Sequence, residues 1–298
     1  MNRKFLNYFW TFLKGMAMGI ADIIPGVSGG TIAFITGIYE ELISSLNEIK
    51  FSLIKDFKNG GFKLISSKIN VPFLICLFLG IIFSVLLFSN FISRLLSEHP
   101  VLIWSFFFGL VTSSILYVTK KIEKWNFLTV LILIIGIIIA YRITKLEVLG
   151  SYDSYIYLFI SGAIAICAMI LPGISGAFIL VIMGSYSPVI LAINNKEISK
   201  IMAFVLGAIF GLMTFSKLLK YLLNDFKNET LAILTGFMAG ALVKIWPWKK
   251  NTEQLYKECV LPSAYEGDPK LLQALSLIII GFLLIFIFDY LVNKKAIE

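Results

Sequence analysis

The stretch Ala21-Asp22-Ile23-Ile24-Pro25-Gly26-Val27-Ser28-Gly29-Gly30 interrupts the first long apolar region of the chain. A second stretch, Ala168-Met169-Ile170-Leu171-Pro172-Gly173-Ile174-Ser175-Gly176-Ala177, repeats its pattern about half a chain length later, so that Pro172 matches Pro25. Both stretches contain Pro-Gly-x-Ser-Gly. Apolar segments that are interrupted at corresponding places in two halves of a chain indicate the binding site of a membrane transporter.

The composition is that of a polytopic membrane protein. The chain has 298 residues, of which 58% are hydrophobic and 15% are charged, and its mean hydropathy is +0.89; soluble domains carry about 25% charged residues. The net charge of +8 comes from 26 Lys and Arg against 18 Asp and Glu. In a membrane protein such an excess lines cytoplasmic loops and contacts anionic lipid, so we expect no nucleic-acid partner. One His and three scattered Cys form no metal motif, and we expect neither a metal nor a cofactor.

Several apolar segments are long enough to cross the hydrocarbon region of a bilayer, which requires about 20 residues. We expect uninterrupted spans at Val71–Ile92, Val101–Thr119, Phe127–Ile143, Ile201–Leu223, Leu231–Ile245 and Leu272–Val292. The two other apolar regions, Phe5–Leu46 and Tyr155–Ile193, contain the motifs. Each is predicted to be a pair of helical segments that meet at the motif, because proline has no N–H and glycine tolerates positive φ. The sequence leaves open whether each pair is re-entrant or spans the membrane.

The two halves of the chain, residues 1–150 and 151–298, carry the same series of segments. Further matches follow the motifs: Leu77–Gly80 resembles Phe204–Gly207, and Phe106–Gly109 resembles Phe237–Gly240. Each half is then one broken or re-entrant helix pair plus three transmembrane helices. A broken pair enters and leaves on one side, so three more crossings make the second half insert upside down. We therefore predict an all-α membrane protein built as an inverted-topology repeat.

Basic residues orient the chain in the membrane. The predicted loops on the side of the N-terminus carry more Lys and Arg than those on the other side, among them Arg3, Lys4, Lys120, Lys121 and Lys124. Because cytoplasmic loops are enriched in Lys and Arg, both termini are predicted to be cytoplasmic.

Each motif predicts an anion site made of backbone N–H groups. Ser28 and Ser175 are favourable N-cap residues, and the helices that follow them present free N–H groups at a positive dipole end. The predicted substrate-binding residues are Pro25, Gly26, Ser28, Gly29, Gly30 and Thr31 in the first motif, and Pro172, Gly173, Ser175 and Gly176 in the second. We expect the two sites to face each other near the middle of the membrane.

Close helix packing is the alternative explanation of the glycines and serines. We favour it for isolated small pairs, namely Gly15/Gly19, Gly207/Gly211 and Gly236/Gly240. We favour a functional role for the duplicated motif, because packing alone does not require a proline at the same place in both halves.

Asp22 is the residue with the sharpest chemical implication. It lies in an apolar run one helical turn before Pro25, and its counterpart in the second half is Met169. A carboxyl group at membrane depth is a functional-site hypothesis, so Asp22 is a candidate proton carrier; alternatively, it caps N–H groups released by the break. Lys14, two turns earlier, is expected either to pair with Asp22 or to extend to the membrane interface. Glu40 is a candidate gating residue.

These residues resemble a known family. Lys14–Gly19, Ala21-Asp22, Pro25–Thr31 and Gly37–Glu40, together with Met169–Gly176 and Trp246-Pro247-Trp248, are similar to the signatures of the PopT-type polyprenyl-phosphate transporters, a bacterial integral-membrane family formerly described as a domain of unknown function. The resemblance covers nearly the whole chain. It implies a flippase of the bacterial cytoplasmic membrane that moves undecaprenyl phosphate from the outer to the inner leaflet for carrier-lipid recycling.

Two other functions fit parts of the sequence. A secondary transporter of a small soluble anion would use the same sites. A membrane enzyme acting on lipid phosphates would need clustered His and Arg or metal-binding carboxylates, and with a single His the chain is not expected to be an enzyme. The coupling ion and the oligomeric state are not indicated.

Overall fold

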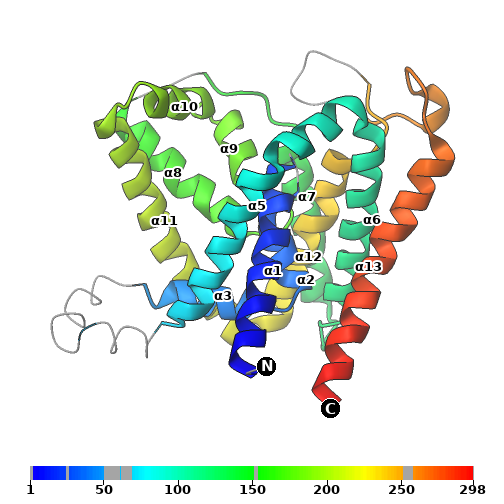
Figure 1. The fold of residues 1–298 in the computed structure, drawn as a ribbon, viewed down its shortest axis with the longest axis horizontal. Helices are drawn as coiled ribbons and strands as arrows, with labels where there is room; N and C mark the ends of the chain where they lie inside the picture. The colour runs from blue at the N-terminus through cyan, green and yellow to red at the C-terminus, as the bar shows by residue number, and fades with distance from the viewer. Residues whose placement is uncertain are drawn as a thin grey trace.

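The computed structural model describes residues 3–24, 27–49, 61, 69–150, 154–250 and 258–297, with backbone alone for 3–5 and 288–297. Within these ranges every regular element is a helix, as predicted (Figure 1). The first half contains α1 (Arg3–Ile23), α2 (Gly29–Ile35), α3 (Tyr39–Asn47), α5 (Val71–Glu98), α6 (Pro100–Thr119) and α7 (Phe127–Thr144). The second contains α8 (Tyr155–Ile170), α9 (Gly176–Ile182), α10 (Tyr186–Asn194), α11 (Ile198–Asp225), α12 (Lys227–Ala241) continued by η1 (Leu242–Ile245), η2 (Pro262–Ala264) and α13 (Leu271–Ile297).

The long helices match the predicted spans. Of the described residues, α5, α6, α7, α11 and the α12–η1 segment form 5 helices long and apolar enough to cross a membrane, or up to 6 if the bent α9–α10 pair counts as one. Their ends agree with the predicted spans within a few residues because hydrocarbon thickness sets the length of the apolar run. The chain is therefore a multi-pass membrane protein.

Each interrupted region contains one break more than predicted. The segment after the first motif divides into α2 and α3 at Gly37, and the segment after the second divides into α9 and α10 at Gly184. These two glycines have φ of 72° and 66°, a left-handed conformation that ends a helix and that other residues adopt at a cost. The helices α9 and α10 are bent by 102° at this point. Each expected helix pair is thus one long helix followed by two short ones.

The same helix crossing occurs in both halves. In the first half α1 packs along α5, and in the second α8 packs along α11. A methyl group on Gly80 would collide with the carbonyl oxygen of Phe12, and one on Gly207 would collide with that of Phe159. These contacts confirm that small residues bring the helices close together, and they link positions matched by the sequence repeat. The inverted relation between the halves stays a prediction.

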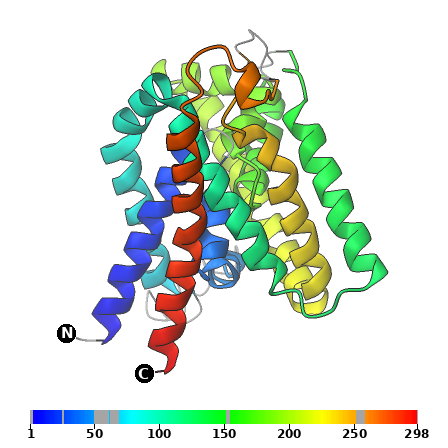
Figure 2. The same cartoon turned by 90° about the vertical axis from the view of Figure 1, so that its right-hand side faces the viewer.

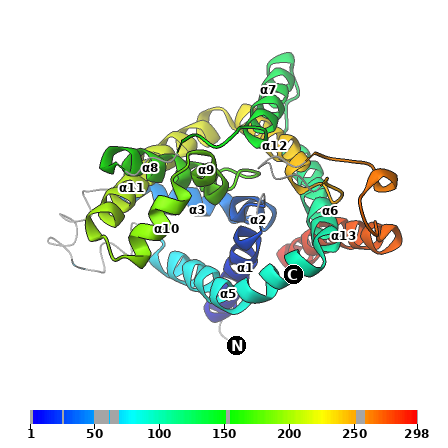
Figure 3. The ribbon, with the colours of Figure 1, turned by 90° about the horizontal axis from the view of Figure 1, so that it is seen from above.

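Figures 1 and 2 place both termini at the same edge of the molecule. The helix α3 lies toward that edge, whereas α10 lies at the opposite edge (Figure 1). Viewed from above, α2 and α9 lie toward the inside, with α5, α7, α11 and α13 around them (Figure 3). All seven residues of α2 are buried. The segment after the first motif is therefore buried at the centre of the fold, whereas in α9 only Gly176 and Ile182 are buried.

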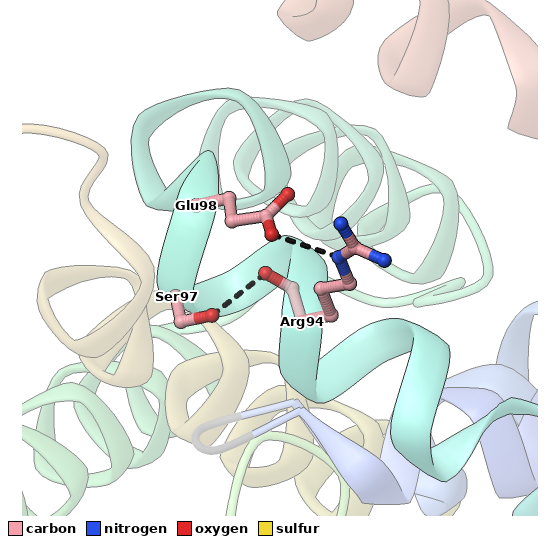
Figure 4. Close-up of polar contacts among 3 residues, drawn as sticks. All are labelled: Arg94, Ser97 and Glu98. Atoms are coloured by element: carbon pink, nitrogen blue, oxygen red, sulfur yellow. Dashed lines mark hydrogen bonds and ion pairs between the residues drawn. The ribbon is translucent and has the colours of Figure 1, made fainter.

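The edge opposite the termini is polar. At the end of α5, the Nε of Arg94 lies 2.8 Å from a carboxylate oxygen of Glu98, and the Ser97 hydroxyl donates to the Arg94 carbonyl (Figure 4). The Trp246 and Trp248 indoles donate to the carbonyls of Val260 and Pro269. Trp248 is buried, and its bond to Pro269 joins the two described parts of this loop, residues 246–250 and 258–270.

Candidate functional site

The two Pro-Gly-x-Ser-Gly breaks contact each other directly. The Ser28 hydroxyl lies 3.3 Å and 3.2 Å from the carbonyl oxygens of Met169 and Leu171, which end α8. In return, the Gly173 N–H donates to the Thr31 hydroxyl at 3.0 Å. Residues 142 positions or so apart are therefore joined by hydrogen bonds in both directions. The structure brings the two predicted sites together.

Gly30 allows this contact. A Cβ at this position would lie 2.6 Å from the carbonyl oxygen of Ile170, closer than real Cβ atoms approach. Any other residue would separate α2 from the end of α8. The sequence predicted that a ligand would approach this backbone; in the structure the other motif approaches it.

Asp22 lies at the N-terminal end of α2. Its carboxylate accepts the Gly29 N–H at 2.7 Å, and a Cβ on Gly29 would lie 2.6 Å from the same carboxylate. An anionic group at this end is favourable because the helix dipole is positive there. The structure thus has the capping contact that the sequence left as one of two roles for Asp22.

The protein itself occupies the N–H groups in the first turn of α2. The Gly30 N–H donates to the Ser28 hydroxyl, and those of Thr31 and Ile32 donate to the Ser28 carbonyl. With the Gly29 N–H on Asp22, the predicted anion site of the first motif holds the carboxylate of the chain.

The second motif is different. The Ser175 hydroxyl accepts the Phe178 N–H at a long 3.4 Å, and the Ser175 carbonyl accepts that of Ile179. The N–H groups of Gly176 and Ala177 have no partner among the residues that the structure describes. Met169 stands where the first half has Asp22. Among the described residues of the two motifs, N–H donors without a partner at the helix start are therefore found at the second motif.

Lys14 bonds to the backbone at the end of α2 and not to Asp22. Its ammonium donates to the carbonyl of Thr36 at 2.9 Å, at the C-terminal end of α2, where a positive charge is favourable. The expected pairing with Asp22 was wrong because it considered only α1, whereas α2 folds back beside it (Figure 1). The position of Lys14 relative to the membrane interface stays a prediction. A single helix thus supplies an acidic cap at one end of α2 and a basic one at the other.

Lys244 is a residue that the sequence analysis missed. Its ammonium lies 3.7 Å from the centre of the Phe178 ring, in the first turn of α9. The sequence signal was a lysine near the end of the apolar run Leu231–Ile245, which we predicted as a membrane span without giving this lysine a role. Lys244 places a positive charge beside the second motif.

The other predicted site residues are dispersed. Pro25 and Gly26 lie outside the described residues. Pro172 is buried in the second break, and Gly173 has φ of 85° beside the backbone of Met238. Glu40 is exposed and belongs to α3, beyond the Gly37 turn. Among the described side chains, no group of three His, Cys, Asp or Glu is placed to hold a metal ion.

Residues 18–260 match the undecaprenyl phosphate translocase-like family. The chain belongs to this family. A polyprenyl-phosphate transporter of Vibrio cholerae serotype O1 is 50% identical over 251 residues, which cover 84% of this chain and 82% of that relative. A polyprenyl-phosphate transporter of Staphylococcus aureus is 35% identical over 253 residues, covering 79% of this chain and 85% of that relative. No solved structure matches the chain.

Proposed function

We propose that this member of the family is a flippase that moves undecaprenyl phosphate from the outer to the inner leaflet of the bacterial cytoplasmic membrane, for reuse of the carrier lipid. The observation that carries the proposal is the direct contact between the two breaks, Ser28 with Met169 and Leu171, and Gly173 with Thr31. A polar passage at membrane depth serves a charged headgroup, while the isoprenoid tail stays in lipid. The family and the names of both relatives support this substrate.

The phosphate first binds the second motif in this mechanism. The Gly176 and Ala177 N–H groups have no partner among the described residues, and Lys244 lies beside them at Phe178. Donors at a helix start and a nearby ammonium together suit a phosphate monoester. Ser175 holds this turn in place as its N-cap.

Transfer to the first motif requires Asp22 to release the Gly29 N–H. The carboxylate and the phosphate compete for the same donor, and two anions at one buried position repel each other. A neutral carboxylic acid is a weaker acceptor, so protonation of Asp22 favours the exchange. This couples the movement of the phosphate to a proton, with Glu40 as the proposed gate at the exit of α3.

The proposed orientation has both termini in the cytoplasm and the halves inverted. The position of the termini at one edge, with α3 near that edge and α10 at the opposite one, supports this arrangement (Figure 1). In this arrangement the phosphate headgroup reaches the second motif from outside and leaves the first motif toward the cytoplasm.

The test is lipid translocation by the purified chain in proteoliposomes, with undecaprenyl phosphate in one leaflet and an imposed pH gradient at clamped potential. Wild type should translocate the lipid, and the gradient should accelerate it. Asp22→Asn keeps an oxygen that accepts the Gly29 N–H but cannot exchange a proton, so its translocation should not respond to the gradient.

Asp225→Asn is the matched control, because Asp225 is exposed at the end of α11. It should respond as wild type does. If Asp22→Asn also responds as wild type does, the coupling role is wrong and the capping role alone remains. No translocation by the wild-type chain would reject the proposed function.

A further inference from the structure

A cavity of about 450 Å³ opens at the C-terminal end of α2. Of the predicted site residues, it includes Glu40 but none from the two motifs. Its lining joins α2, α3, the α6–α7 loop and the start of α12: Phe34, Gly37, Tyr39, Glu40, Lys120, Lys121, Glu123, Lys227 and Leu231. The floor is buried and aromatic, whereas the lysines at the rim are exposed. The α2 helix of seven residues thus separates this cavity from the first motif by about 10 Å.

Tyr39 is the unusual member of the floor. Its side chain is 2% exposed and stacks near Phe34, with ring centroids 4.6 Å apart. Its hydroxyl is fully buried and has no hydrogen-bond partner among the described residues. A buried polar group without a partner costs about 1–3 kcal/mol. Because Tyr39 also lines the cavity, a ligand in the cavity is the candidate partner for its hydroxyl.

The rim supplies positive charge from two separate elements. Lys120 and Lys121 directly follow α6, and their ammonium groups lie over the rings of Phe286 and Tyr117. Lys227 is the first residue of α12, at the positive end of that helix. The lining of the cavity therefore includes three lysines together with Tyr39, whose hydroxyl is buried and has no described partner.

Glu40 and Glu123 also line the cavity. Three ammonium groups against two carboxylates leave a small positive excess. Such a balance favours an anion without holding it tightly, which suits a site from which a ligand must leave.

We propose that this cavity is a second binding site of the transporter, which receives a phosphate monoester headgroup after it leaves the first motif. Tyr39 donates a hydrogen bond to a phosphate oxygen, and Lys120, Lys121 and Lys227 balance its charge. The inference rests on the proposed function for the direction of travel. The shared chemistry is the phosphate group, whose source is either a lipid or free phosphate.

The test is protection of single cysteines from a maleimide in the full chain, with Cys76, Cys167 and Cys259 replaced by Ser. Glu123→Cys reports on the cavity, and Lys124→Cys, which is exposed beside it but does not line it, is the control. Farnesyl phosphate should protect Glu123→Cys and leave Lys124→Cys unprotected. Protection by inorganic phosphate would show that the site binds the phosphate group alone, and its failure to protect would show that the lipid is also required. Farnesol, which lacks the phosphate, should not protect.

Substitutions in the Glu123→Cys background identify the ligand contacts. Combining Lys120→Gln, Lys121→Gln and Lys227→Gln should raise the half-protecting concentration at least about tenfold, and Tyr39→Phe should raise it by about tenfold, the effect of one hydrogen bond to a charged group. Tyr39→Phe should not lower the unfolding temperature, because the hydroxyl has no partner to lose.

Equal protection at both cysteines, protection by farnesol, or unchanged protection after the lysine substitutions would overturn the proposal. Translocation by wild type with unchanged rates in the lysine variant would overturn the cavity and leave the proposed function intact. If farnesyl phosphate protects Glu123→Cys but the wild-type chain does not translocate the lipid, the cavity is supported as a phosphate site and the proposed function is rejected.

Discussion

Asp22 and Ser28 show how single side chains close an anion site from within. Asp22 accepts the Gly29 N–H, and Ser28 accepts the Gly30 N–H while its hydroxyl also reaches the carbonyls of the other motif. The equivalent serine, Ser175, makes only a long bond to Phe178 among the described residues. The hydroxyls of Ser28 and Ser175 occupy matching positions in the repeat, but that of Ser28 makes more hydrogen bonds within the described residues.

Ser28→Ala should consequently destabilise the protein more than Ser175→Ala. Loss of an N-cap costs about 0.5–2 kcal/mol, and Ser28→Ala also removes the hydrogen bond between the motifs. The free energy of unfolding, measured by steric trapping in bicelles, should fall by about 1–2 kcal/mol for Ser28→Ala and by about 0.5 kcal/mol for Ser175→Ala. Equal losses would mean that the contact between the motifs contributes nothing to stability.

Cys259 should be a slow thiol. Burial raises the pKa of its thiol above the usual value, and the nearby Lys249 and Lys145 offset only part of this effect. Its thiol also lies 3.4 Å from the Val243 carbonyl. Because the thiolate is the reactive form, maleimide labelling at pH 7 should be slower than for an exposed cysteine such as Lys124→Cys, and should accelerate as the pH rises. Equal rates at pH 7 would contradict the buried position.

At the scale of elements, the glycines divide into those needed for a turn and those needed for packing. Gly37 has φ of 72° and open space around it, whereas a methyl group on Gly80 would collide with the backbone of α1. Gly37→Ala should cost about 1 kcal/mol through backbone strain, and Gly80→Ala up to about 3 kcal/mol through overpacking. Ser276→Ala, exposed on α13, is the control and should stay within about 0.5 kcal/mol of wild type. Unfolding free energies in the reverse order would show that the α1–α5 contact adapts.

The long helices could be predicted from the sequence because their ends are set by apolar length. Val71 and Phe127 begin both the predicted and the observed helices. The turns at Gly37 and Gly184 could not be predicted, because an isolated glycine in an apolar run is compatible with a helix and with its end.

The contact between the two motifs could be predicted from the sequence, but the partners of their polar groups only in part. The two motifs were expected to face each other, and they touch through Ser28 and Gly173. The positions of Lys14 and Lys244 depend on how α2 folds back on α1 and how η1 passes α9, and neither follows from periodicity along one helix.

At the scale of the whole molecule, the inverted repeat makes a prediction about sidedness. Single cysteines at Lys124 and Lys196, in a cysteine-free background, should react with an impermeant maleimide from opposite sides of the membrane. Lys124 follows α6, and Lys196 lies in the turn after α10 at the edge opposite the termini. Labelling of both from the same side would reject the inverted arrangement. If either variant no longer translocates the lipid, the experiment is repeated with a cysteine at a neighbouring residue.

The clamp that α1 places on α2 has a mechanical consequence. Asp22 of α1 bonds to one end of α2 and Lys14 of α1 bonds to the other. The two helices are therefore expected to move together as one unit. The turn at Gly37, with its positive φ, lies directly beyond this pair of helices and is the expected hinge. A tilt of α1 in the bilayer would move Ser28 away from the end of α8. The same tilt would also displace Phe34 and Tyr39, which line the cavity at the C-terminal end of α2.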